Sequence, residues 1–252
     1  MSAAPPMTPP PIEPVQPGLS EPARIINTFF APTKTFEDLK RKASWWVPLL
    51  LISIMGIAFH VTVDKKVGFD QIAREILTQS PQFQQQPADQ QQKTLSIVTA
   101  STKYGGYAFP LVAIIGALLV GTIMMMIFNF GLQAEISFGQ SLAIMMYAWL
   151  PVIVRCVLGI VSVLVGNPDN FHLQNPVATN PAYFLDPATT SKFLYTFLTS
   201  FDAIKLWIVA LVGAGFAVNS KKKISIGTGI MVVGVCYFVW KLIVAGWAGL
   251  RG

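Results

Sequence analysis

Ionisable residues inside apolar sequence are the groups of this chain that could do chemistry. Asp202 and Lys205 lie three residues apart, where a long apolar run begins and continues as LWIVALVGAGFAV. Residues three apart share one face of a helix. Charged groups in lipid cost roughly 2.5–3.5 kcal/mol each on insertion scales, so they usually pair, face a bundle interior or serve a function. The first question is therefore which residues share a helix bundle with Asp202 and Lys205.

The composition is that of a membrane protein. Hydrophobic residues make up 53% of the 252 residues and charged residues 12%, whereas a soluble globular domain carries about 25% charged residues. Five apolar runs approach or exceed the ~17 residues that a membrane span needs. We predict an all-α, multi-pass membrane helix bundle with five transmembrane helices, at about 46–63, 107–131, 141–165, 199–218 and 224–247.

Two segments precede the first span. Residues 1–20 are rich in proline and predict a disordered tail. Residues 21–44 carry two short amphipathic patterns separated by Pro32, and we expect two interfacial helices lying on the membrane surface. Within them, Thr35-x-x-Asp38 resembles a capping box with Asp in place of Glu or Gln. Residues 45–249 then form the transmembrane domain.

The basic residues predict the orientation of the bundle. Two tight clusters, at 40–42 and 221–223, lie beside span ends, where positive charge marks the cytoplasmic side. This predicts a cytoplasmic N-terminus and a C-terminus on the opposite side. Topogenic signals of this kind explain the net charge of +6 better than a nucleic-acid partner does.

Depth along the helices brings four charged residues to one level. Counting from the cytoplasmic ends of the predicted spans at ~1.5 Å per residue places the four side chains in one layer: Arg155 at ~21 Å, Asp202 at ~24 Å, Lys205 at ~20 Å and Lys241 at ~26 Å. In a structural interpretation, Asp202 pairs with Arg155 or Lys205 and locks helices together while Lys241 snorkels outward. In a functional one, the layer binds a lipid headgroup or another anion. A proton or ion relay is a third alternative.

Other residue types offer little chemistry. Glu135 stands alone between the second and third spans, as a solvated loop charge or a partner contact. His60 and His172 lie in different regions, and Cys156 and Cys236 lie inside apolar runs. The motifs of metalloproteases, serine hydrolases and phosphate-binding loops are all missing from the sequence. We therefore predict no metal, no cofactor and no enzymatic activity.

Small residues recur at helical spacing in the last two spans. They form three patterns of the kind that lets helices approach closely in lipid: Ala210-xxx-Ala214, Gly213-xxx-Ala217 and Ala245-xxx-Gly249. We expect them to pack helices within the chain, and a homo-oligomer is the alternative.

Three groups of residues, in this order and spacing, resemble the Yip (Ypt/Rab-interacting protein) membrane family in its short bacterial branch. They are Phe30-x-Pro32-x-x-x-Phe36-x-x-Leu39 before Trp46-x-Pro48-Leu49, then Phe138-x-Gln140-x-Leu142 through Tyr147-Ala148-x-x-Pro151, and then Phe201-Asp202-x-x-x-x-Trp207. The last is similar to the family's most recognisable short motif. The resemblance covers residues 25–247.

The resemblance implies an integral multi-span protein with a cytoplasmic N-terminus, in a bacterial inner membrane. Eukaryotic relatives bind prenylated Rab GTPases and act in vesicle transport. We expect this chain to share the membrane scaffold of these relatives but not their GTPase partner, because a bacterial cell lacks Rab proteins. The predicted function is a non-enzymatic membrane scaffold or adaptor that organises lipids or partner proteins, in membrane trafficking or envelope organisation. Its expected partners are membrane lipids, other membrane proteins or a second copy of the chain. The alternative is a small-solute or ion transporter that uses the charged layer.

Overall fold

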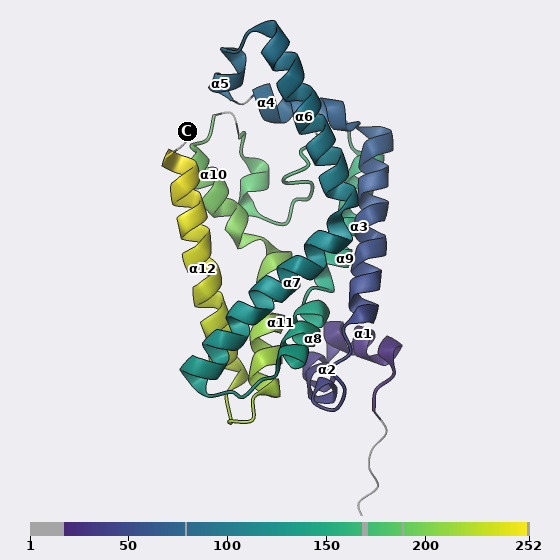
Figure 1. Ribbon diagram of the computed structural model, residues 1–252, viewed down its shortest axis with the longest axis vertical. Helices are drawn as coiled ribbons and strands as arrows, with labels where there is room; N and C mark the ends of the chain where they lie inside the picture. The colour runs from purple at the N-terminus through teal and green to yellow at the C-terminus, as the bar shows by residue number, and fades with distance from the viewer. Residues whose placement is uncertain (1–17, 79, 168–170, 188, 251–252) are drawn as a thin grey trace, which may run out of the picture.

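The computed structural model describes residues 18–78, 80–167, 171–187 and 189–250, and these residues fold as helices and loops without a strand. Most of the predicted tail, residues 1–17, lies outside the described residues, as does Arg251. The helices form an elongated bundle whose long axis follows the membrane-length helices (Figure 1). The predicted all-α membrane bundle is confirmed.

Four helical stretches are long and apolar enough to cross a membrane. They are α3 (Trp46–Lys66), α7 (Phe109–Met126) with its π-helical extension η1 (Ile127–Gly131), the pair α8 (Phe138–Ala148) and α9 (Pro151–Val165), and α12 (Ile226–Leu250). Helices α3, α7 and α9 each carry a proline in the first turn, where its missing N–H costs no helical hydrogen bond. The described residues therefore hold four clear candidate spans, close to the predicted ranges.

The fifth candidate span is bent. Helix α10 (Lys192–Leu198) and the short 3-10 segment η4 (Thr199–Phe201) meet α11 (Ala203–Asn219) at an angle of 55°. The break falls at Asp202, whose extended backbone ends one helix and begins the next. The count is four spans, or five if this bent pair crosses as one unit.

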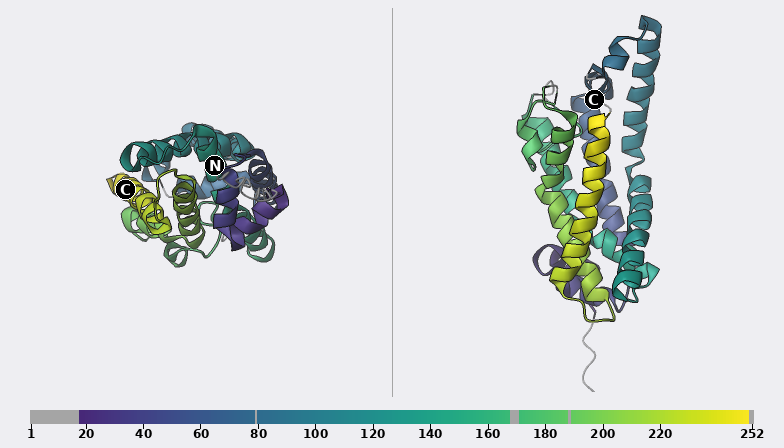
Figure 2. Two further views of the ribbon diagram at one scale, coloured as in Figure 1. Left: turned by 90° about the horizontal axis from the view of Figure 1, so that it is seen from below. Right: turned by 90° about the vertical axis from the view of Figure 1, so that its left-hand side faces the viewer.

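The two ends of the bundle differ. One end carries α1 (Glu21–Phe30), α2 (Pro32–Leu39) and the turn before α12, and we call it the α1–α2 end. The opposite end carries α4 (Phe69–Thr78), α5 (Pro81–Gln84) and the first half of α6 (Ala88–Tyr107), and we call it the α4–α6 end. Helix α12 ends there too, as both views show (Figures 1 and 2).

Helices α1 and α2 pack into the bundle. The amphipathic pattern predicts helices on the membrane surface, but Phe36 and Leu39 are completely buried in the main core beside Tyr147 and Phe216. The Asn219 side chain also donates to the Phe36 carbonyl at 2.9 Å, joining α11 to α2. The apolar face of α2 therefore covers the ends of α8 and α11, while Ile26 and Phe30 of α1 stay exposed.

Helices α11 and α12 cross with their backbones in contact. A methyl group at Gly213 would lie 2.5 Å from the Ile230 Cα, and one at Gly229 would lie 2.3 Å from the Gly213 carbonyl oxygen. Ala217 borders the same crossing. The predicted Gly213-xxx-Ala217 pattern thus packs helices within the chain.

Candidate functional site

The charged layer draws on three helices. Arg155 lies in α9, Asp202 immediately before α11, Lys205 in the first turn of α11, and Lys241 in α12. Asp202 is 2% exposed, and the three bases are half-buried. Helix α11 contacts both α9 and α12, so the helices that carry these four residues are neighbours.

Asp202 serves as the N-cap of α11. Its Oδ1 accepts hydrogen bonds from the backbone N–H groups of Ile204 and Lys205, both at 3.0 Å. Its Oδ2 accepts a hydrogen bond from the Thr179 hydroxyl at 2.8 Å. An aspartate at this position satisfies helix N–H groups that have no carbonyl partner and complements the positive end of the helix dipole.

The expected ion pair of Asp202 is not formed. Within the described residues, the ion pairs within 4.0 Å join neither Arg155 nor Lys205 to the Asp202 carboxylate. The structural interpretation from sequence was wrong on this point, because the carboxylate faces the end of its own helix and the loop hydroxyl of Thr179. Asp202 instead holds the loop before α10 against α11, as the hydrogen bond from the Ala203 N–H to the Thr179 carbonyl also does.

The three bases find weak partners or none. The Lys205 ammonium donates to the Thr199 carbonyl at 3.1 Å. The Lys241 ammonium lies 5.7 Å from the centroid of the Tyr237 ring, a cation–π contact. Across the described residues, Arg155 has no hydrogen bond or ion pair. The layer thus carries three cations and one carboxylate, a net charge of +2. Among the described residues, the N–H donors of Arg155 have no acceptor.

The other two residues of the short motif have packing roles. The Phe201 ring contacts those of Phe197 and Phe238, with centroids at 5.3 Å and 5.5 Å. The Trp207 ring meets Phe29 edge to face at 5.6 Å. Phe201 therefore ties the bend before α11 to α12, and Trp207 ties α11 to the N-terminal helix α1.

Glu135 lies in the loop between η1 and α8. Its carboxylate is 3.0 Å from the Lys221 ammonium, and both side chains are largely exposed. Exposed pairs of this kind contribute about 0–1 kcal/mol. The loop is held more firmly by Asn129, whose side chain bonds both the N–H and the carbonyl of Ile136. Glu135 is thus a surface ion-pair residue at the α1–α2 end.

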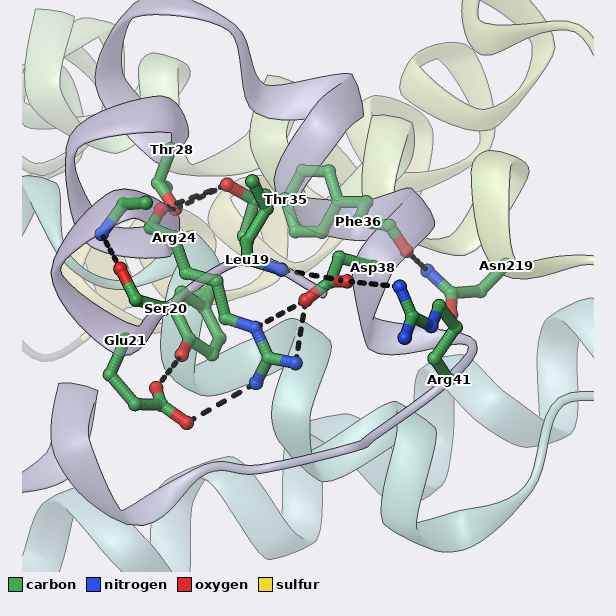
Figure 3. A network of polar contacts seen from close by, with 12 residues as sticks. Leu19, Ser20, Glu21, Arg24, Thr28, Thr35, Phe36, Asp38, Arg41 and Asn219 are labelled. Carbon is green, nitrogen blue, oxygen red and sulfur yellow. Dashed lines mark hydrogen bonds and ion pairs between the residues drawn. The ribbon is translucent and has the colours of Figure 1, made fainter. Parts of the chain in front are cut away.

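A buried polar network joins α1, α2 and α8, and sequence reasoning missed it (Figure 3). The Arg24 guanidinium donates to the Asp38 carboxylate at 2.6 Å and also reaches Glu21 at 3.2 Å. The Tyr147 hydroxyl donates to the other oxygen of Glu21 at 2.5 Å. Arg24 and Asp38 are 3% and 7% exposed. The network therefore fixes two helices of the N-terminal segment to a spanning helix.

Several further hydrogen bonds complete this network. The Thr28 and Thr35 hydroxyls both donate to the Arg24 carbonyl at 2.8 Å, and the Leu19 N–H donates to Asp38. Burial alone would lower the pKa of Arg24, but hydrogen bonding to Asp38 and Tyr147 and the charge of Asp38 outweigh it and raise that pKa. Arg24 therefore stays charged where it is buried.

The predicted capping box is wrong. Helix α2 begins after Ala31 without a side-chain cap, and Thr35 and Asp38 turn toward Arg24 instead. The signal available in the sequence was the spacing of polar residues inside the amphipathic pattern. Arg24 and Thr28 are four residues apart and share one face of α1, and Thr35 and Asp38 are three apart and share one face of α2.

The α4–α6 end holds a cavity of about 1410 Å³ between α4, the loop before α10, α10 itself and the end of α12. His172 and Glu75 hydrogen-bond beside it. Asn175 and Asn180 pair through their side-chain amides. Across the described part of the chain, there is no group of three or more His, Cys, Asp and Glu residues that could hold a metal ion. The cavity is therefore lined by both polar and apolar residues, and it reaches the ends of α10 and α12.

Comparisons with known proteins point to one family. The model of the Yip1 domain matches residues 26–243, which is most of the chain. That range includes the charged layer, Phe201 and Trp207, the second half of α1 and all of α2. No curated protein and no solved structure matches the chain. The chain, an integral membrane protein with several apolar helices, belongs to the Yip1 domain family.

Proposed function

We propose that this protein is a non-enzymatic membrane scaffold or adaptor that organises lipids or partner proteins at the α1–α2 end. The observation that carries the proposal is the buried Arg24–Asp38 ion pair, with Glu21 and Tyr147 around it. A buried ion pair is weak support for stability, and its better-attested use is to specify one arrangement of the groups it joins. Here that arrangement is a fixed α1–α2 unit on the bundle.

The fixed unit presents a basic surface. Two clusters of exposed cations lie at this end, and we call their six residues the basic platform: Lys40, Arg41, Lys42, Lys221, Lys222 and Lys223. The hydrogen bond from Asn219 to the Phe36 carbonyl joins the end of α11 to α2. The Lys221 N–H also donates to the Ala134 carbonyl at 2.9 Å. The platform is therefore held on structured backbone.

The basic platform supports a cytoplasmic location for this end. Positive charge beside span ends marks the cytoplasmic side, and anionic headgroups attract such clusters by about 1 kcal/mol per Lys or Arg. The first and last described helices, α1 and α12, begin and finish at opposite ends of the bundle (Figure 1). We place the protein in a bacterial inner membrane, with α1 and α2 inside and an odd number of crossings.

Recovery of what binds the protein tests this function. The full-length protein is solubilised in mild detergent from its native membrane, purified by affinity, and its bound lipids and proteins are identified by mass spectrometry. The proposal predicts enrichment of anionic lipid or of a defined membrane protein over an unrelated multi-span protein purified in parallel. Recovery of neither would overturn it.

A further inference from the structure

We propose that the three bases of the charged layer, Arg155, Lys205 and Lys241, form a binding site for a phosphate-bearing anion. The inference rests on the proposed function, because it names a ligand class for a protein that organises lipids. It uses residues on α9, α11 and α12, far in sequence from the basic platform, so the two proposals can fail separately.

The first argument is the charge of the layer. Three cations from different helices are half-buried here. Lys205 bonds the Thr199 carbonyl, and Lys241 lies over Tyr237, whose hydroxyl bonds the neighbouring Ser200 carbonyl. Half-buried like charges on packed helices are unfavourable without an anion. Asp202 offsets one charge, but its carboxylate already accepts hydrogen bonds from two backbone N–H groups and from Thr179. The net charge of +2 fits a phosphate group, which carries one or two negative charges.

The second argument is that the bases are held in place. The Lys205 ammonium is tethered to the Thr199 carbonyl, and the Lys241 ammonium lies over the Tyr237 ring. The Tyr237 hydroxyl in turn donates to the Ser200 carbonyl at 2.8 Å, joining α12 to the bend before α11. Two cations are thus positioned before a ligand arrives, which lowers the ordering entropy that binding must overcome.

The third argument is the guanidinium of Arg155. Within the described residues it has no partner, although it is half-buried on a spanning helix. A guanidinium binds two phosphate oxygens through parallel N–H groups, which a lysine ammonium cannot do. We therefore assign Arg155 as the principal anion contact, with Lys205 and Lys241 as charge donors.

The test measures anion binding by the delipidated, full-length protein in neutral detergent, with native mass spectrometry and thermal stabilisation as readouts. Three probes are compared: phosphatidylglycerol, zwitterionic phosphatidylcholine and inorganic phosphate. The variants are Arg155→Gln and Arg155→Lys. Arg74→Gln is the matched control, because Arg74 is an exposed arginine on α4 and not part of the charged layer.

We expect Arg155→Gln to weaken phosphatidylglycerol binding at least tenfold, Arg155→Lys to weaken it less, and Arg74→Gln to leave it unchanged. Arg155-dependent binding of phosphatidylglycerol alone identifies a lipid headgroup as the source of the phosphate. Arg155-dependent binding of inorganic phosphate identifies a free anion. If Arg155→Gln does not fold, Lys241→Gln takes its place. The inference would be overturned if a folded Arg155→Gln or Lys241→Gln variant bound phosphatidylglycerol and inorganic phosphate as tightly as the wild type does.

Discussion

The Arg24 guanidinium lies 2.6 Å from the Asp38 carboxylate, although the two residues are fourteen apart in sequence and belong to different helices. Both side chains are almost completely buried. This contact fixes α1 against α2. The hydrogen bond from Tyr147 to Glu21 and the buried Phe36 and Leu39 side chains then hold the pair of helices on the membrane bundle.

Removal of one partner of this ion pair should destabilise the protein strongly. Arg24→Ala leaves the buried Asp38 carboxylate with only the longer ion pair to Arg41, at 3.8 Å, and removal of a buried ion-pair partner costs about 3–5 kcal/mol. The free energy of unfolding, measured by SDS titration of the detergent-solubilised protein, should fall by that amount. Lys34→Ala, at an exposed position of α2, should change it by less than about 0.5 kcal/mol.

The apolar double variant Arg24→Met/Asp38→Leu tests whether the loss of stability comes from the single buried charge that Arg24→Ala leaves behind. It removes both charges together and should recover most of the lost free energy. Equal losses for Arg24→Ala and Lys34→Ala would show that the ion pair contributes nothing to the fold.

Substitutions of Asp202 should show that its side chain stabilises the protein as the N-cap of α11 and not as an ion-pair partner. Asparagine keeps a side-chain oxygen for the N–H groups of Ile204 and Lys205, so Asp202→Asn should be nearly neutral. Asp202→Ala removes the acceptor and should cost roughly 0.5–2 kcal/mol. A double-mutant cycle with Thr179→Val should show coupling, because the two side chains are hydrogen-bonded. Equal losses for Asn and Ala would instead indicate that the negative charge matters.

Alanine substitutions at two glycines of α12 provide a matched test of the crossing between α11 and α12. Gly229→Ala places a methyl group 2.3 Å from the Gly213 carbonyl oxygen, whereas one at Gly234 meets nothing within 4 Å. Overpacking of this kind costs about 1–3 kcal/mol. SDS titration should therefore show a loss for Gly229→Ala and little change for Gly234→Ala. Similar values for both would contradict the backbone contact between α11 and α12.

The transporter alternative makes a separate prediction about flux. A scaffold with an anion site in its charged layer should give proteoliposomes no specific solute or ion flux above protein-free liposomes. Flux that Asp202→Asn abolishes, while the variant keeps its stability, would favour transport. Fluorescent reporters of protons, potassium and chloride inside the liposomes make the measurement.

Much of the fold follows from local sequence. Apolar runs predicted α3, α7 with η1, the α8–α9 stretch and α12 near their observed bounds. The fixed rise of a helix then predicts one depth for Arg155, Asp202, Lys205 and Lys241. Rigid helices make depth predictable, because distance along the axis depends only on residue count.

Side-chain partners did not follow from local sequence. Asp202 caps α11 and accepts from Thr179, a loop residue whose position is set by tertiary folding. The Arg24–Asp38 ion pair likewise depends on how α1 and α2 dock on α8, which no local pattern determines. A single carboxylate can satisfy a helix end, a hydroxyl or a guanidinium, and spacing does not choose among them.

The measurement that tests the scaffold proposal most directly is a comparison of co-purified lipids and proteins among three forms of the full-length protein. The first is the wild type, and the second replaces Lys40, Arg41 and Lys42 with Gln. The third replaces three exposed cations of the α4–α6 end, Lys65, Lys66 and Arg74, with Gln and so removes the same charge. Cysteine labelling in intact cells confirms that each form keeps the wild-type topology. We predict that the enriched lipid or partner is lost from the second form and kept by the third. Equal retention by all three forms would contradict the proposal.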